Sequence, residues 1–412
     1  MKYPAFSIAK RYLFSRKSTR VVNVISMITA FAMAVGASAL IIVMSTFNGF
    51  EDLVKSLYKV FYTDLVILPA EGKFFEVDED ILKSLDQTTE VLNYTLVIEE
   101  NVLAQFADKQ AIVTIKGVDD NYFNVVNDLK HYMYSGSMEF NYNQVPAAII
   151  GVGIAYNLGV NTSMPNNYLT LHMPRSDRSA FNDLANAFRS DNIYAGGVFA
   201  VQQDFDNKYI ITSIDFAQAL MNLSGKVSAI ELKTNDKVHP RKLKTDLQNL
   251  IGDQYTIKTR HEQNETLYKV MQTEKWAVFA ILSFIVLIAA FNIIGSLSML
   301  VIDKKQDIAT LRSLGANKQL IRNIFLIEGL LISLLGAFSG LILGTFVCWI
   351  QIRFGLIKMP GASFMIDAYP VKIMWEDLAL IITIIVSISL LMAWLPAHRA
   401  VQQSNSLSPN KH

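Results

Sequence analysis

The sequence predicts a membrane protein with four transmembrane α-helices and a large α+β domain between helices 1 and 2. Hydrophobic residues make up 51% of its 412 residues and charged residues only 18%, which is typical of a membrane protein with a sizeable aqueous part. Four largely uncharged runs reach the roughly 20 residues that a helix needs to cross a bilayer. Residues 1–20 carry six basic and no acidic side chains, whereas residues 51–275 carry 21 basic and 30 acidic ones, a net charge of −9.

Transmembrane helices are assigned to residues 21–50, 276–302, 324–352 and 378–397. Backbone groups in lipid need hydrogen-bond partners within the segment, so these runs are expected to be helical although they contain many β-branched residues. The first run could instead be a signal peptide, because Ala37-Ser38-Ala39 resembles a cleavage site. Its 30 uncharged residues exceed the apolar core of about 7–15 residues found in signal peptides, so we interpret it as a span.

The placement of Lys and Arg predicts the orientation, because basic flanks stay on the cytoplasmic side. Residues 1–20, 303–323 and 398–412 are basic and are expected in the cytoplasm. Residues 51–275 are acidic and residues 353–377 are balanced, so both are expected on the opposite side. The first segment also has apolar residues at helical spacing, which favours an interfacial helix on the membrane surface. An ordinary basic flank is the alternative.

Residues 51–275 combine strand-like and helix-like patterns, which indicates an α+β domain. Apolar residues at helical spacing predict a helix over Arg241–Leu250, and residues 262–270 are expected to lead as a helix into the second span. The middle, about 135–215, is richer in Asn, Ser, Pro and Gly and suggests an inserted subdomain. Strands are predicted at residues 64–69, 111–118, 227–233 and 255–259.

A short amphipathic segment, Asp307–Ala316, lies between the second and third spans. Leu311 and Leu314 are three residues apart, so both can face a groove on a soluble partner. Gly315 can adopt a positive φ and end the helix. We therefore predict a cytoplasmic coupling helix within residues 303–323, with a basic connecting loop as the alternative. Its predicted coupling residues are Ile308, Thr310, Leu311, Arg312, Ser313, Leu314, Gly315 and Ala316.

Small and polar residues indicate where the spans approach one another, because lipid provides no hydrophobic drive for helix association. Gly336, Gly340 and Gly344 recur every four residues in the third span, which fits packing within the chain and dimerisation equally. Asn292 in the second span could line a pathway or hydrogen-bond a neighbouring helix. Glu328 at the start of the third span is expected at the membrane interface.

The sequence contains no recognisable motif for catalysis, nucleotide binding or metal binding. No G-x-x-x-x-G-K-[ST] phosphate loop occurs, and the six histidines show no HExxH or similar metal spacing. The single cysteine, Cys348, allows neither a disulfide framework nor a cysteine metal site. Basic residues lack the aromatic interleaving of nucleic-acid grooves, and the acid pair Glu99-Glu100 is expected at the solvated surface. We expect no catalytic residue, metal or bound cofactor, so the energy for any transport must come from a partner.

Several strings resemble the FtsX-like ABC transporter permeases, and in particular their lipoprotein-releasing (LolC/LolE-type) subgroup. The strings are Met44-Ser45-Thr46-Phe47-Asn48-Gly49-Phe50-Glu51, Phe291-Asn292-Ile293-Ile294, Asp303–Ala316, Tyr369-Pro370-Val371 and Leu395-Pro396-Ala397-His398-Arg399-Ala400. The resemblance covers both membrane portions well and the α+β domain faintly. We expect five residues to serve the substrate path or helix packing, namely Gly36, Ala37, Asn48, Asn292 and Gly295.

The resemblance implies a permease of the bacterial inner membrane with cytoplasmic termini and a MacB-like periplasmic domain. It implies a second permease subunit, either the same chain or a relative. It also implies a separate cytoplasmic ATPase subunit, which binds ATP and Mg and docks on the coupling helix. In this subgroup, lipoproteins enter between the first two spans and pass to a periplasmic carrier.

One region departs from the subgroup, whose carrier-binding hairpin has a Pro-x-Gly tip. Residues 174–192 contain no glycine and include a helix-like run, Ala180–Phe188. Direct capture of a carrier by this region is therefore left open. Two other functions of the wider family also stay open: a signalling permease that activates a cell-wall hydrolase, and MacB-like export of peptides or drugs.

Overall fold

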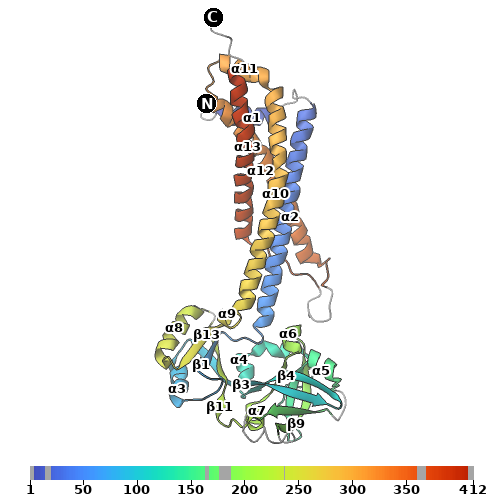
Figure 1. Ribbon diagram of the computed structural model, residues 1–412, viewed down its shortest axis with the longest axis vertical. Coiled ribbons are helices and arrows are strands. Elements are labelled where there is room, and N and C mark those ends of the chain that lie inside the picture. The colour runs from blue at the N-terminus through green and yellow to red at the C-terminus, as the bar shows by residue number, and fades with distance from the viewer. Residues whose placement is uncertain are drawn as a thin grey trace. The chain divides into compact units, whose positions relative to one another are not determined.

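The computed structural model describes residues 4–13, 20–162, 167–175, 187–235, 237–359 and 368–406. The chain divides into two compact units, and Figure 1 labels many of their helices and strands. The membrane unit comprises Met1–Leu53, Lys269–Met359 and Asp367–His412. The α+β domain comprises Val54–Tyr268.

Four long helices of the described chain confirm the four-span prediction. They are α2 Arg20–Tyr58, α10 Glu265–Asp303, α12 Lys318–Phe354 and α13 Trp375–Ser406. Helix α1, Pro4–Leu13, precedes them, and α11, Lys305–Ser313, joins α10 to α12. The 39 residues of α2 and of α10 span roughly 58 Å each, about twice the hydrocarbon thickness of a bilayer. Both helices therefore continue beyond the predicted spans 21–50 and 276–302.

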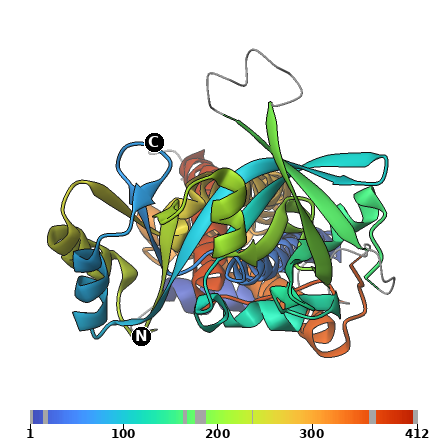
Figure 2. The same cartoon turned by 90° about the horizontal axis from the view of Figure 1, so that it is seen from below.

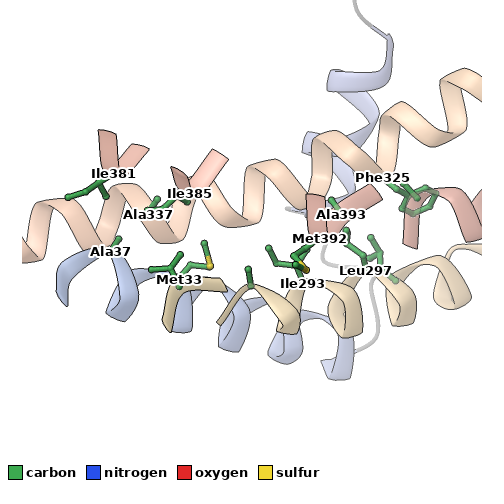
Figure 3. Close-up of a cluster of buried hydrophobic side chains, with 14 of the residues drawn as sticks. Met33, Ala37, Ile293, Leu297, Phe325, Ala337, Ile381, Ile385, Met392 and Ala393 are labelled. Carbon is green, nitrogen blue, oxygen red and sulfur yellow. The ribbon is translucent and has the colours of Figure 1, made fainter. Parts of the chain in front are cut away.

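The four long helices share one apolar core, shown in Figure 3. Every long helix contributes to it, because each carries an apolar stripe that the others cover. The core includes Met33 and Ala37 of α2, Ile293 and Leu297 of α10, Phe325 and Ala337 of α12, and Ile385 and Ala393 of α13.

The glycine repeat of α12 brings this helix against α2. A Cβ atom on Gly336 or Gly340 would overlap the backbone carbonyl of Ala30 or Ala34, and one on Gly344 would overlap the side chain of Ile41. Only glycine permits such an approach of two backbones. Of the two uses that the sequence left open for this repeat, the structure shows packing within the chain.

In the α+β domain, eleven strands of the described residues form one sheet, and β2 and β11 form a separate pair. The main path runs β13-β1-β12-β3-β4-β10-β7-β9-β5, with β6 beside β7 and β8 beside β3 and β9 (Figure 2). Most neighbours are antiparallel, whereas β10 runs parallel to β4, and β7 parallel to β9. The strands are β1 Leu65–Pro69, β2 Phe75–Glu76, β3 Val91–Phe106, β4 Lys109–Val118, β5 Met133–Gly136, β6 Asn141–Tyr142, β7 Val145–Gly151, β8 Tyr168–Pro174, β9 Phe188–Phe199, β10 Tyr209–Ser213, β11 Lys226–Val227, β12 Ala229–Thr234 and β13 Tyr255–Thr259.

Helices of this domain cover two separate apolar cores of the sheet. One core lies under α3 and α8, where Leu243, Leu247 and Ile251 of α8 repeat at helical spacing and are buried. The other contains residues of α5 and α7, including Ile154 and Phe216. The helices are α3 Glu79–Gln87, α4 Tyr122–Val125, α5 Val152–Leu158, α6 Gln203–Asp206, α7 Ile214–Met221, α8 Pro240–Ile251 and α9 Arg260–Gln263, with a 3-10 turn at Asn127–Tyr132.

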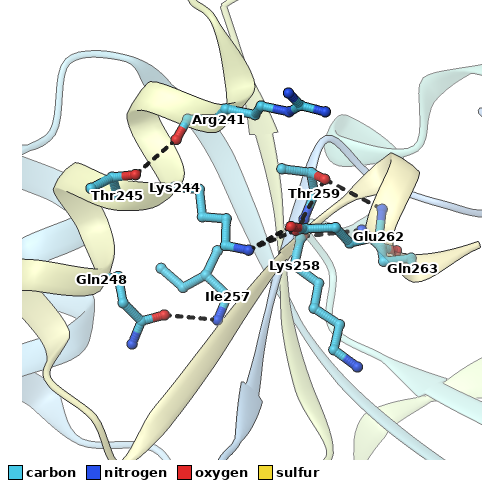
Figure 4. Close-up of polar contacts among 9 residues, drawn as sticks. All are labelled: Arg241, Lys244, Thr245, Gln248, Ile257, Lys258, Thr259, Glu262 and Gln263. Carbon is cyan, nitrogen blue, oxygen red and sulfur yellow. Dashed lines mark hydrogen bonds and ion pairs between the residues drawn. The ribbon is translucent and has the colours of Figure 1, made fainter. Parts of the chain in front are cut away.

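A polar network fixes the turn that leads into α10 (Figure 4). Thr259 and Glu262 form a reciprocal capping box at the start of α9, and Lys244 of α8 donates to Glu262 at 2.7 Å. Partial burial alone would raise the pKa of Glu262, but the hydrogen bonds from Lys244 and Thr259 lower it. Arg260 pairs with Asp64 at 2.8 Å and donates to the carbonyl of Tyr62 at 2.7 Å. The lead-in to α10 is therefore anchored to the sheet.

The structure confirms the strands predicted around residues 64–69, 111–118, 227–233 and 255–259, and the helix over Arg241–Leu250. It differs at about 135–215, where we expected an inserted subdomain. Strands β7, β9 and β10 of this range instead continue the common sheet through the pairing of β10 with β4. Composition alone does not show this, because long-range pairing decides which sheet a strand joins.

The arms of the 174–192 region belong to two neighbouring strands. Strands β8 and β9 pair antiparallel as far as Pro174 and Phe188, and Arg175 donates to the carbonyl of Ala187 at 2.9 Å. The predicted helix-like run Ala180–Phe188 falls on residues 180–186, which lie outside the described residues, and on the beginning of β9. The tip of this hairpin therefore stays a prediction.

Candidate functional site

The coupling segment is a helix with defined ends. Helix α11 ends where Gly315 takes a φ of +91°, and the amide of Ala316 donates to the carbonyl of Leu311 at 3.0 Å. A glycine in the left-handed region with such a bond is a common way to end a helix, as predicted here for Gly315. The Asn317 side chain then accepts from the amide of Leu320 at 2.7 Å and starts α12.

One side of the coupling segment is turned to the bundle and the other to solvent. Ile308 is only 2% exposed and joins the core of the membrane unit, whereas Leu314 is 80% exposed. Thr310, Ser313 and Gly315 are also exposed, and Leu311, Arg312 and Ala316 are half-buried. Of the predicted coupling residues, Ile308 therefore lies on the side that meets the bundle. Its side chain anchors α11, because it lies on the apolar side of this amphipathic helix.

Lys304 fastens α11 to its neighbours. It directly precedes α11 and is 8% exposed, and its ammonium lies 3.4 Å from Asp303 and 4.0 Å from Asp307. Its ammonium also lies 5.6 Å from the ring centroid of Tyr12 in α1, a cation–π distance. Displacement of α11 would therefore reach α10 and α1 directly. In the sequence, Lys304 is only one of several basic residues in the segment 303–323, because its partners follow from the fold.

A second cluster, which we call the polar latch, joins three helices at the end of the bundle away from α11. It consists of Asn48 of α2, Lys275 of α10 and Asp377 of α13. Lys275 donates to Asn48 Oδ1 at 2.8 Å and lies 3.7 Å from Asp377, while the Asn48 amide nitrogen donates to Asp377. Asn48 is 3% exposed. Its amide uses both its donor and its acceptor, so it links a cation and an anion from two other helices.

The end of α2 is also pressed against the segment before α13. A Cβ atom on Gly49 would overlap the backbone of Pro370, so only glycine fits there. The Lys372 amide donates to the carbonyl of Ser45 at 2.8 Å, and its ammonium pairs with Asp52 at 2.8 Å. Two of the sequence strings that resemble the permease family, around Asn48-Gly49 and Tyr369-Pro370, are thus in contact with each other.

The other predicted path residues lie elsewhere on the helices. A Cβ atom on Gly36 would lie 3.0 Å from Val286 Cγ2, so this glycine sets the approach of α2 and α10, and Ala37 is buried in the core. Asn292 and Gly295 are exposed on α10 and do not join the latch. Glu328, expected at the membrane interface, is only 1% exposed and lies inside the bundle.

The α+β domain contains a buried charged triad. Lys116 lies 2.7 Å from Glu231 and 3.0 Å from Glu99, beside the ring of Tyr122 at 5.4 Å. Burial alone would lower the pKa of Lys116, but the two carboxylates raise it well above its ordinary value, so the ammonium stays charged. Glu99 and Glu100, which we expected at the solvated surface, are both half-buried: Glu99 joins this triad and Glu100 pairs with the exposed Lys73 at 3.1 Å.

The triad borders a cavity of about 470 Å³, which Phe61, Tyr62 and Tyr209 also line. Among the described residues, no group of three or more His, Cys, Asp or Glu side chains is placed to hold a metal ion. The described geometry consists of polar ties between helices and of a short helix, α11, with one exposed side.

Two sequence profiles match this chain. The FtsX-like permease C-terminal profile matches residues 279–404, and the MacB-like periplasmic core domain profile matches residues 26–250, more than half of the chain. The chain therefore belongs to the family of FtsX-like permeases with a MacB-like periplasmic core domain.

Several relatives match this chain along nearly its whole length. The lipoprotein-releasing system transmembrane protein LolE of Haemophilus influenzae is 23% identical, over 96% of this chain and 97% of its own. The LolC protein of Neisseria meningitidis serogroup B is 26% identical over 95% of each chain. The periplasmic region of MacB from Actinobacillus actinomycetemcomitans aligns with a TM-score of 0.36 and 10% identity, over 53% of this chain and 98% of that one.

Replacing Lys116 by methionine is expected to destabilise the α+β domain by about 3–5 kcal/mol, because it leaves buried carboxylates without their counter-charge. Lys73 provides the matched control, since its side chain is 74% exposed. Lys73→Met should change the stability by no more than about 1 kcal/mol. Denaturant unfolding of the purified full chain, followed by circular dichroism, measures both. An equal decrease in the free energy of unfolding for the two variants would contradict the structural role of the triad.

Proposed function

We propose that this chain is the permease subunit of an ATP-driven ABC transporter that extracts lipoproteins from the bacterial inner membrane and passes them to a periplasmic carrier. The observation that carries the proposal is similarity over nearly the whole length to lipoprotein-releasing permeases. The fold adds a docking helix at one end of the bundle and a set of polar ties at the other.

The proposed orientation places both termini and α11 in the cytoplasm, since Lys304, Lys305, Arg312, Lys318 and Arg322 cluster around α11. A separate ATPase subunit, with its own ATP and Mg, docks on the exposed side of α11 through Leu314 and the end of the helix at Gly315. Movement of α11 passes to α10 and α1 through Lys304 and to the core through Ile308.

The proposed substrate path lies between α2 and α10. In this structure the two helices are in contact at Gly36 and Val286, and the latch ties them through Asn48 and Lys275. A lipoprotein entering here requires that these contacts separate. The latch is suited to such a step, because exchanging hydrogen bonds and ion pairs with water costs less than opening a packed apolar core.

Reconstitution tests the function. The chain is placed in proteoliposomes with its ATPase subunit and an acylated lipoprotein, and a periplasmic carrier is added outside. Release to the carrier is expected with ATP and absent without it. A correctly assembled complex that hydrolyses ATP and releases no lipoprotein would overturn the substrate assignment. Depletion in cells that gave chained, undivided cells with correctly localised lipoproteins would favour the signalling function instead.

The coupling role of α11 makes a separate prediction. Leu314→Asp is expected to lower ATP-dependent release about tenfold or more, the scale expected when a protein interface loses an apolar anchor. Gly315→Val should act in the same direction, because valine disfavours the positive φ that ends α11.

The control is Gln306→Asp, which adds the same charge to an exposed position in the first turn of α11. An acid there suits the helix dipole, so insertion and release should be normal. Release that is equal in Leu314→Asp and Gln306→Asp would contradict docking through this end of the helix.

A further inference from the structure

The cavity beside the Lys116 triad lies on the face of the sheet opposite the core under α3 and α8. Val66 of β1 is paired with Glu231 of β12 on one side and with Lys258 of β13 on the other, and all three line the cavity. Ile67, the next residue of β1, points to the opposite face and belongs to that core. The cavity volume of about 470 Å³ is within the range of small-molecule sites.

Three aromatic side chains contribute to the lining of this cavity. They are Phe61 and Tyr62, which follow α2, and Tyr209 of β10. The rings of Phe61 and Tyr209 are stacked with their centroids 5.3 Å apart. Among the described residues, the hydroxyls of Tyr62 and Tyr209 have no hydrogen-bond partner. The cavity thus combines an aromatic surface with two phenol groups that are available to a ligand.

The Glu99 carboxylate lies near both phenols. Burial, and after it the charge of Glu99, raises the pKa of Tyr62 and of Tyr209, so both hydroxyls keep their protons. Within the described part of the chain, the one partner of the Glu99 carboxylate is Lys116 at 3.0 Å. The Glu99 side chain is 30% exposed and lines the cavity, so a ligand can reach this carboxylate from the side away from Lys116.

The triad offers more hydrogen-bond acceptors than Lys116 can satisfy. One ammonium serves two carboxylates, and one carboxylate oxygen of Glu231 has no hydrogen-bond partner among the residues described. Glu231 is only 7% exposed and burial raises its pKa, so Glu99 is the carboxylate of the triad that a ligand can use. Glu100, which also lines the cavity, already pairs with Lys73 at 3.1 Å.

We propose that this cavity binds a primary amine carried on an apolar body, with the ammonium at Glu99 beside Tyr62 and Tyr209. A primary ammonium has three N–H donors, and the Glu99 carboxylate and the two phenol oxygens provide three acceptors. Aromatic rings attract a cation, and the Phe61 ring covers the apolar body. This site goes beyond the proposed function and does not depend on it.

Calorimetric titration of the full chain in lipid nanodiscs tests the site. The probe is 2-phenylethylamine, and 2-phenylethanol serves as the neutral probe of nearly the same shape. Nanodiscs without protein give the background from partition into lipid. The amine is expected to bind at least tenfold more tightly than the alcohol, because only the ammonium makes charge-assisted hydrogen bonds.

Two variants test the assigned groups. Glu99→Gln should weaken amine binding about ten- to hundredfold, the scale of a hydrogen bond to a charged group, while the pair of Lys116 and Glu231 stays intact. Tyr209→Phe retains the ring and removes the hydroxyl, so binding should weaken about two- to tenfold. The matched control is Asp108→Asn, which removes one charge at the exposed turn between β3 and β4 and should change nothing. Circular dichroism confirms that each variant is folded.

Three results would overturn the proposal. They are no binding of the amine above the background of empty nanodiscs, equal binding of the amine and the alcohol, and an equal loss of binding in Glu99→Gln and Asp108→Asn. If Glu99→Gln does not fold, Tyr209→Phe decides, and unchanged amine binding in that variant contradicts the site.

Discussion

The close contact between the backbones of α2 and α12 is the constraint on which the membrane unit depends. Lipid supplies no hydrophobic drive between helices, so they associate through packing and polar contacts. Gly336, Gly340 and Gly344 allow α12 to lie directly on the carbonyls of α2. This contact fixes α2, and α2 in turn carries Gly36 against α10 and presents Asn48 to the latch.

The ties of α10 are concentrated near its two ends. Ser26 and Ser296 share a hydrogen bond of 3.0 Å near one end, and Lys275 reaches Asn48 near the other. Lys275 and Asp303 are separated along α10 by roughly 42 Å. Since α11 follows Asp303 directly, a displacement of α11 also displaces the end of α10 at Asp303. The other end of α10 is held by the hydrogen bond and the ion pair of Lys275. Within the proposed function, this arrangement lets the cytoplasmic ATPase subunit control the polar latch between α2 and α10 on the periplasmic side.

Much of this architecture could be predicted from the sequence, because the responsible signals are local. Four apolar runs predicted the spans, and Gly315 predicted the end of α11. The latch could not be predicted, since Asn48, Lys275 and Asp377 are far apart in the chain and only helix packing brings them together. The same holds for the Lys116 triad and for strand order in the range 135–215. For Ile308, the amphipathic pattern showed that α11 has two sides but not which side meets the bundle.

The most direct test of the central claim is to hold the latch closed. In a Cys348→Ser chain, Asn48→Cys and Lys275→Cys are bridged with a short, cleavable bifunctional thiol reagent in the reconstituted complex. Bridging is expected to stop ATP-dependent lipoprotein release while ATP hydrolysis continues, and cleaving the reagent is expected to restore release. Undiminished release from chains whose latch is bridged would contradict it.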